Sequence, residues 1–429
     1  MNQTSLYGSG QNLRAKESMM RDFLTLDDLD FKDKVVLLRV DINVPVDKDT
    51  KKISESKRIS ESITTIEELA DKKAKVVVLA HQGRAGDYDF LPLDQHADAL
   101  KDVLKEEFDY VDDTIGIAAR EKMKSLQSGG VLLLQNIRFL TEETLDLPPE
   151  AHARGILVSR LSSLADLFVN DAFPSAHRSH ASIVGLAATL PSAAGRIMEK
   201  ELLYDRQAVM NPEHPVVYIL GGGKPDDNIE VLKHGFQKSI IDRVLSSGVL
   251  GLLFMVAREY DLGKETINFL RNKGHLEQLQ AVKDLLIKYG PHIDVPVDVA
   301  YKLNGERVEI TTKELPAKGI IEDIGKGTTQ IYKAVIEAAK TMVVKGPPGV
   351  YEDSDFEVGT KEILEAVSKS DGFSLVGGGH TLSAIEALRI NEKGFSHISL
   401  GGGALINYLS GRTLPAFEAL QQAAKRYKA

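Results

Sequence analysis

Short apolar runs alternate with longer amphipathic runs along most of this 429-residue chain, and this alternation limits its fold more than any other feature. Near-continuous Val and Leu content occurs at residues 35–40, 76–80, 131–134 and 167–169. Such content is typical of parallel strands that are covered on both faces. Apolar residues at 59, 63, 66 and 69 predict a helix between the first two strands. The pattern therefore predicts βαβ units.

The second half of the chain repeats this pattern, and the whole is too long for one ordinary hydrophobic core. Strands are predicted at residues 216–220, 243–245, 294–297, 342–344, 373–376 and 397–400. Pro191 and the small residues 192–195 precede a predicted helix at 199–210 and mark a boundary. We expect an α/β protein of two Rossmann-like domains, 21–195 and 196–404, each a parallel sheet flanked by helices. We expect the polar leader 1–20 to be disordered.

Composition and missing motifs exclude several classes of protein. The chain has no cysteine, so it can form neither a disulfide nor a thiolate metal site. Its net charge of −9 argues against nucleic acid or an anionic membrane as the main partner. No apolar run approaches the ~20 residues that span a bilayer, and no signal-peptide core is present, so a cytoplasmic protein is expected. P-loop, dinucleotide-binding and zinc spacings are also missing, and no protein-built metal site is predicted.

Cationic and hydrogen-bonding side chains follow the predicted strands of the first half. In open α/β sheets, ligands bind at the carboxyl ends of the strands, and guanidinium groups match phosphate and carboxylate oxygens. Convergence of several strand ends therefore predicts a site for a small polyanion. Taken singly, each arginine could equally be a solvated surface charge, and His81, His177 and His180 could be structural. The side chains at these strand ends include Arg39, Asp41, Asn43, His81, Arg84, Arg138 and Arg178, and Arg58 stands at the start of the first predicted helix.

Glycine triplets follow three predicted strands of the second half, at residues 221–223, 377–379 and 401–403. Glycine lets the backbone approach a ligand closely, and a helix that begins there offers free N–H groups to phosphate. One such triplet could be a simple turn, but three predict phosphate or nucleotide binding. A polyanion site in one domain and a phosphate site in the other suggest phosphoryl transfer, which depends on positioning and charge stabilisation.

Eight strings, in order from about residue 23 to 420, resemble the phosphoglycerate kinase family, particularly its archaeal-type branch. They are RVDINVP, HQGR, LLLQNIRF, VNDAFPSAHRSHAS, LGGGKPDDNI, GPPGVYE, VGGGHT and ISLGGGA. The resemblance implies reversible phosphoryl transfer from 1,3-bisphosphoglycerate to ADP, giving 3-phosphoglycerate and ATP in glycolysis or gluconeogenesis. It implies Mg²⁺ bound with ADP or ATP, small-molecule substrates and a monomer. It also implies a helical hinge near residues 192–205 that closes the domains, and a tail, 405–429, that returns to the first domain.

The resemblance also assigns roles to individual residues. The residues implied in holding 3-phosphoglycerate or its bisphosphate are Asp41, Asn43, Arg58, His81, Arg84, Arg138 and Arg178. The residues implied in catalysis are Arg58, Lys224, Gly378 and Gly402. The residues implied in nucleotide binding are Gly222, Lys224, Pro347, Glu352, Gly377, Gly378, Gly379 and Thr381.

Three positions depart from the family's usual pattern. Asn228 stands where a second lysine is usual, Lys345 where asparagine is frequent, and His380 where an aspartate near magnesium is frequent. We hypothesise that Lys345 supplies the charge that Asn228 lacks; the alternative is an exposed lysine at a strand end. Two other functions stay open at this point: a catalytically silent ligand-binding protein on the same scaffold, and a regulatory anion-binding protein whose glycines serve only as turns.

Overall fold

The computed structural model describes residues 22–54, 57–104 and 107–428, so the predicted leader lies outside the described residues. The chain divides into two compact units. Unit 1 comprises Met1–Lys200 and Thr413–Ala429, and unit 2 comprises Glu201–Arg412. The helix α8 (Arg196–Val209) runs through the first division, which lies after residue 200 rather than after 195. Residues 405–412 of the predicted returning tail belong to unit 2.

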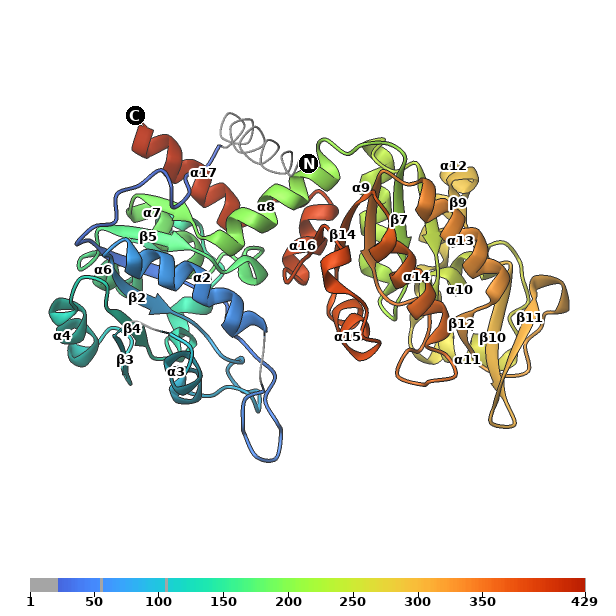
Figure 1. Cartoon of the computed structure of the whole chain (residues 1–429), viewed down its shortest axis with the longest axis horizontal. Helices are drawn as coiled ribbons and strands as arrows, with labels where there is room; N and C mark the ends of the chain where they lie inside the picture. The colour runs from blue at the N-terminus through green and yellow to red at the C-terminus, as the bar shows by residue number, and fades with distance from the viewer. Residues whose placement is uncertain (1–21, 55–56, 105–106, 429) are drawn as a thin grey trace, which may run out of the picture. The chain divides into compact units, whose positions relative to one another are not determined.

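Unit 1 is built on a six-stranded parallel sheet (Figure 1). Its strands are β1 (Val35–Arg39), β2 (Lys75–Leu79), β3 (Phe108–Val111), β4 (Val131–Leu134), β5 (Leu167–Asn170) and β6 (Ser192–Ala194). They lie in the order β3-β4-β2-β1-β5-β6. The strand order therefore reverses between β1 and β5, and such a point is where open α/β sheets bind ligands.

Both faces of this sheet are covered, as its apolar strands predict. Val36 and Leu38 of β1 share one core cluster with Ile66 and Leu69, while Leu37 between them is equally buried. The helices of unit 1 are α2 (Lys57–Asp71), α3 (Asp94–Lys101), α4 (Ile117–Ser125), α5 (Pro149–Ala153), α6 (Ile156–Ser162), α7 (Leu186–Thr189) and α17 (Pro415–Lys428). Burial of apolar side chains on both faces is the main term that stabilises this unit.

Unit 2 contains a second six-stranded parallel sheet, in the order β15-β14-β13-β7-β8-β9. Its strands are β7 (Val216–Leu220), β8 (Arg243–Ser246), β9 (Ile293–Asp294), β13 (Thr341–Lys345), β14 (Phe373–Gly377) and β15 (His397–Ile398). Here the order reverses between β7 and β13. A smaller antiparallel sheet holds β10 (Asp298–Leu303), β11 (Glu306–Thr311) and β12 (Ile321–Ile324).

Alternate residues of β7 belong to two separate cores. Val216 and Tyr218 pack in one cluster, whereas Val217 and Ile219 pack in the other. The flanking helices are α9 (Pro225–Gln237), α10 (Gly248–Ala257), α11 (Lys264–Asn272), α12 (Leu279–Tyr289), α13 (Lys326–Ala338), α14 (Val358–Lys369), α15 (Gly379–Ala387) and α16 (Gly403–Leu409). The predicted class, two parallel sheets flanked by helices, is confirmed.

The sequence prediction missed five strands. β3 and β6 are edge strands, and β6 (Ser-Ala-Ala) lies in the segment predicted as a boundary. The remaining three are β10, β11 and β12. In β11, Glu306–Thr311, no side chain is fully buried, so it lacks the continuous apolar run that identified the parallel strands.

Candidate active site

The point where the strand order of unit 1 reverses brings Asp41 and Arg58 together. Asp41 follows β1, and its Oδ1 atom accepts a hydrogen bond from Nη1 of Arg58 at 2.9 Å. Arg58, near the start of α2, also donates to the carbonyl oxygen of Asn43 at 3.1 Å. Ser175 Oγ donates to the other carboxylate oxygen of Asp41 at 2.8 Å. The carboxylate thus positions the guanidinium group of Arg58, for which the family resemblance implies a role in catalysis.

Burial alone would raise the pKa of Asp41, but the charges of Arg58 and Arg39 and the hydrogen bond from Ser175 outweigh it. The pKa of Asp41 is therefore held well below its usual range, and the residue is ionised at neutral pH. His81 is the opposite case. Its burial lowers its pKa well below the usual value despite the attraction of Asp41, so it is neutral at neutral pH.

The tautomer of His81 follows from its neighbour Arg39. Nη2 of Arg39 lies 2.9 Å from Nδ1 of His81. Because a guanidinium group can only donate hydrogen bonds, Nδ1 must be the acceptor and the proton must be on Nε2. His81 can therefore offer one N–H donor to an anionic ligand without carrying a charge.

Arginines from three further strand ends complete the cluster. Burial, and then the charges of Arg39 and Arg178, lower the pKa of Arg138 to about 10. The pKa of Arg178 is likewise lowered, by burial and then by Arg84. Cations that lower one another's pKa lie close enough to repel, so a bound anion would relieve that repulsion. This edge of unit 1 thus gathers six residues that the sequence analysis names for a polyanion site: Asp41, Arg58, His81, Arg84, Arg138 and Arg178.

Asn43 has a bridging position in this site. Its Oδ1 atom accepts a hydrogen bond from the backbone N–H of Gly83 at 2.8 Å. Gly83 follows β2, and its carbonyl oxygen accepts from Nη1 of Arg138 at 2.5 Å. Asn43 therefore connects the ends of β1 and β2 and sets the position of the backbone to which Arg138 binds.

A buried layer beneath these residues was missed by the sequence prediction. Arg39 is 0% exposed; its Nε atom donates to Ser182 Oγ at 2.8 Å, and Nη2 lies 3.9 Å from Glu143. Glu143 accepts hydrogen bonds from the backbone and hydroxyl of Ser182. His180, whose burial lowers its pKa to about 3, lies 3.8 Å from the same carboxylate. The signal was the arginine at the end of β1, but its partners are too distant in sequence to infer.

In unit 2, one glycine of each triplet has a positive φ angle. Gly222, Gly378 and Gly402 have φ angles of +75°, +95° and +51°, which side chains other than glycine rarely adopt. A Cβ atom added to Gly379 or Gly402 would meet nothing within 4 Å. The last two triplets lead directly into α15 and α16, so helix N-termini with free N–H groups follow them.

The other nucleotide-site candidates lie in the segments that follow β7, β13 and β14. Lys224 is exposed and directly precedes α9. Thr381 is buried, and its hydroxyl accepts from the N–H of Gly346 at 2.8 Å. The carbonyl oxygen of Pro347 accepts from the N–H of Gly222 at 2.8 Å. Glu352 is exposed in the segment after β13. Thr381 and Pro347 thus hold the turns in place, while Lys224 and Glu352 have side chains accessible to a ligand.

Lys345 is not the exposed strand-end lysine of the alternative interpretation. It is buried, and its Nζ atom donates to Oδ1 of Asn228 at 2.8 Å. The two residues that depart from the family pattern are therefore direct neighbours. His380, the third departure, is exposed at the start of α15.

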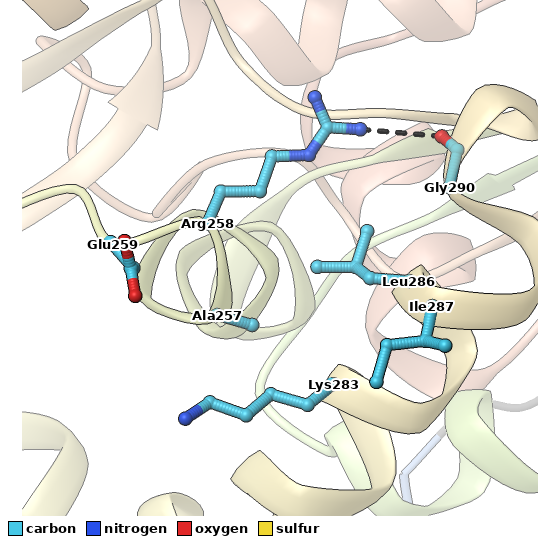
Figure 2. A pocket seen from close by; sticks show the side chains of 7 residues that line it. All are labelled: Ala257, Arg258, Glu259, Lys283, Leu286, Ile287 and Gly290. Atoms are coloured by element: carbon cyan, nitrogen blue, oxygen red, sulfur yellow. Dashed lines mark hydrogen bonds between the residues drawn. The ribbon is translucent and has the colours of Figure 1, made fainter.

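A surface pocket elsewhere in unit 2 contains none of the predicted site residues. It lies between the end of α10 and α12 (Figure 2). Arg258 on its wall donates to the carbonyl oxygens of Gly290 and Ile293, which satisfies the guanidinium group within the fold. Within the described ranges, no three His, Cys, Asp or Glu side chains gather as metal ligands, and no helix has the length and apolarity to cross a membrane.

Fold and site together define a class of enzyme. The guanidinium groups of unit 1 can bind one anion, and the main-chain amides at the glycine turns of unit 2 can bind phosphates. This combination is typical of a kinase, which transfers a phosphoryl group. The family model described as phosphoglycerate kinase matches residues 26–412. The chain belongs to the phosphoglycerate kinase family, as its motifs predicted.

Individual relatives support this assignment over nearly the whole chain. The phosphoglycerate kinase of Methanobacterium bryantii is 45% identical over 404 residues, which cover 94% of this chain and 98% of that protein. That of Saccharolobus solfataricus is 43% identical and covers 92% of this chain and 96% of its own length. The crystal structure of phosphoglycerate kinase from Pyrococcus horikoshii OT3 shares 37% identity with a TM-score of 0.86, covering 94% of this chain and 99% of that one.

Proposed function

We propose that this chain catalyses reversible phosphoryl transfer from 1,3-bisphosphoglycerate to ADP, giving 3-phosphoglycerate and ATP. The observation that supports this most directly is the cluster of arginines around ionised Asp41 and neutral His81 at the strand-order reversal of unit 1. A three-carbon acid with a phosphate group has the oxygens that such a cluster binds. A regulatory anion-binding protein whose glycines serve only as turns would use the same cluster, but it would not bind Mg-ADP, so equilibrium binding of Mg-ADP separates the two functions.

Unit 1 is proposed to hold the phosphoglycerate. Arg84, Arg138 and Arg178 pair with phosphate and carboxylate oxygens, and Nε2 of His81 donates a further hydrogen bond. Asn43 and Asp41 accept bonds from hydroxyl groups and fix the neighbouring backbone and Arg58. Arg58 stabilises the charge on the transferring phosphoryl group, and this kind of electrostatic term is usually the largest in such catalysis.

Unit 2 is proposed to hold ADP or ATP. The turns with Gly222, Gly377, Gly378 and Gly379 approach the phosphates through their amides, and Lys224 and Gly402 contact the transferred group. Pro347 and Glu352 line the adenosine pocket, and Thr381 supports it through its bond to Gly346. Mg²⁺ enters as part of the nucleotide substrate, since it binds readily to phosphates and keeps several waters. We also propose small-molecule partners, a monomer and a cytoplasmic location.

A coupled assay for ATP formation from 1,3-bisphosphoglycerate and ADP tests this function. We expect wild type to be active, and Arg58→Ala and Lys224→Ala each to lower kcat on the order of 10²–10³-fold, as loss of one charge-stabilising donor does elsewhere. Arg160→Ala changes an exposed arginine of α6 and serves as the matched control. An inactive wild type that still binds Mg-ADP would instead identify the catalytically silent protein.

A further inference from the structure

Lys345 lies at the centre of the proposed phosphate site. It ends β13, where it is paired in register with Leu220 of β7 and Gly377 of β14. Its carbonyl oxygen accepts from the N–H of Gly221 at 2.9 Å. A Cβ atom on Gly378 would lie 3.6 Å from Cγ of Lys345. The side chain therefore begins between two of the three glycine turns, next to the point where the strand order reverses.

The ammonium group of Lys345 is held by two residues in the first turns of α9. It donates to Oδ1 of Asn228 at 2.8 Å, and Asn228 in turn donates from Nδ2 to the carbonyl oxygen of Gly221 at 2.9 Å. The nearest oxygen of Asp227 lies 3.6 Å away, longer than a normal hydrogen bond. Asn228 is therefore a spacer that holds the lysine beside the first glycine turn.

This arrangement leaves the positive charge of Lys345 incompletely balanced. Its side chain is only 8% exposed, and a buried charge is costly unless it is paired. Burial is the largest factor that lowers its pKa, Asp227 raises it, and nearby Lys224 lowers it again. Asn228 offers only a neutral acceptor. A phosphate that reaches this position would supply the negative charge that these contacts supply only in part.

We propose that Lys345 binds the phosphoryl group that moves to and from the nucleotide, as a second cation beside Lys224, and that Asn228 and Asp227 position it. The inference rests on the proposed function and deepens it. In the transfer, the bond from phosphorus to the carboxyl oxygen breaks and a bond to the terminal oxygen of ADP forms. Lys345 keeps its proton throughout and contributes only charge, so no further reactant is needed.

Substitution of Lys345 tests this role. Lys345→Met keeps most of the apolar stem and removes the charge; we expect kcat to fall about 100-fold or more. The KM for 3-phosphoglycerate should change less than threefold, because that substrate is proposed to bind in unit 1. Lys345→Arg should recover part of kcat. Lys333→Met removes an exposed lysine of α13 that pairs with Glu362, and should leave both constants unchanged.

An exchange variant separates a chemical role from a structural one. In Asn228→Lys with Lys345→Asn, the ammonium group comes from α9 and the amide from β13, so we expect at least tenfold higher kcat than in Lys345→Met. Thermal unfolding of each variant checks that it is folded. If wild type is active and the kcat of Lys345→Met is within threefold of the wild-type kcat, the inference is overturned and the proposed function stands. An inactive wild type would overturn the proposed function itself. If Lys345→Met does not fold, failure of the folded exchange variant to turn over would overturn the inference.

Discussion

Individual residues of unit 1 depend on hydrogen-bond and charge partners that lie far from them in the sequence. Arg39 was visible as an arginine at the end of a predicted strand and looked like one more ligand for an anion. The structure buries it completely, with Ser182 and His81 as hydrogen-bond partners and Glu143 nearby. It sets the tautomer of His81 and supports the site from below.

Arg39→Met should destabilise unit 1 strongly, because it leaves the buried carboxylate of Glu143 without its cationic neighbour. Loss of one partner from a buried pair costs roughly 3–5 kcal/mol of unfolding free energy. Urea unfolding followed by circular dichroism measures this. Arg160→Met, an exposed arginine of α6, should change the unfolding free energy by less than about 0.5 kcal/mol. Equal losses of unfolding free energy in the two variants would show that the buried contacts of Arg39 do not stabilise unit 1.

Glycine at 346 is required for a different reason, which is the approach of two backbones. Its φ angle is +84°, and a Cβ atom there would lie 2.2 Å from the carbonyl oxygen of Gly221. Gly346→Ala should therefore lower the unfolding free energy by about 2 kcal/mol or more and raise the Kd for Mg-ADP. Gly379→Ala, where an added Cβ meets nothing within 4 Å, is the matched control for stability. Calorimetry measures both the unfolding free energy and the Kd for Mg-ADP. Similar losses of unfolding free energy in Gly346→Ala and Gly379→Ala would contradict this account.

At the scale of elements, the ends of strands are held by side chains from neighbouring helices. His96 on α3 is 0% exposed and lies with Nε2 3.1 Å from Oε1 of Gln82, which follows β2. Gln82 also bonds the backbone of Val44 in both directions, at 3.0 Å each. One helix thus fixes the segments after β1 and β2 that carry Asn43 and Arg84.

Stability should decline in mild acid partly through His96. Burial lowers its pKa from 6.5 in the unfolded chain to about 4. The native state then binds fewer protons than the unfolded state, so this contribution is lost as pH falls from 6.5 towards 4. At pH 5 the loss of unfolding free energy from this residue amounts to about 2 kcal/mol. Urea unfolding at pH 7 and pH 5 measures the slope, which should be shallower in His96→Asn; an unchanged slope would exclude this role.

Strands with a continuous run of large apolar residues could be predicted from the sequence, and strands without such a run could not. β7 was predicted with its observed bounds, because all five of its residues are apolar and buried. The edge strand β3 (Phe-Asp-Tyr-Val) has Asp109 in its middle and only Val111 buried, so its pattern was weak. The candidate site residues were named because they precede or follow predicted strands, and their binding roles stay predictions. Glu143 and Ser182 were missed because only the tertiary fold brings them to Arg39.

At the scale of the whole chain, unit 1 is assembled from both ends of the sequence. The helix α17 packs on β6 and α7, and Ala424 forms a small core with Leu24 and Ala193. The N–H of Ala416 donates to the carbonyl oxygen of Ala176 at 3.1 Å, only two residues before Arg178. The last helix therefore supports the segment that carries one of the proposed phosphoglycerate ligands.

Deletion of residues 413–429 should loosen unit 1 and spare unit 2. Hydrogen exchange followed by mass spectrometry should show faster exchange in β6 and α7, where the helix packs, and unchanged protection in β7 and β13. The 3-phosphoglycerate affinity should fall and the affinity for Mg-ADP should not. Uniformly faster exchange in both units, or none in β6, would contradict the division into two units.

This discontinuous construction has a consequence for synthesis on the ribosome. Residues 201–412 all leave the exit tunnel before α17 does, although most of unit 1 was translated earlier. The second unit can therefore complete its core while the first still lacks the helix that closes it. A chain that stops after residue 412 would have unit 2 complete and would leave unit 1 without the helix that packs on β6 and α7.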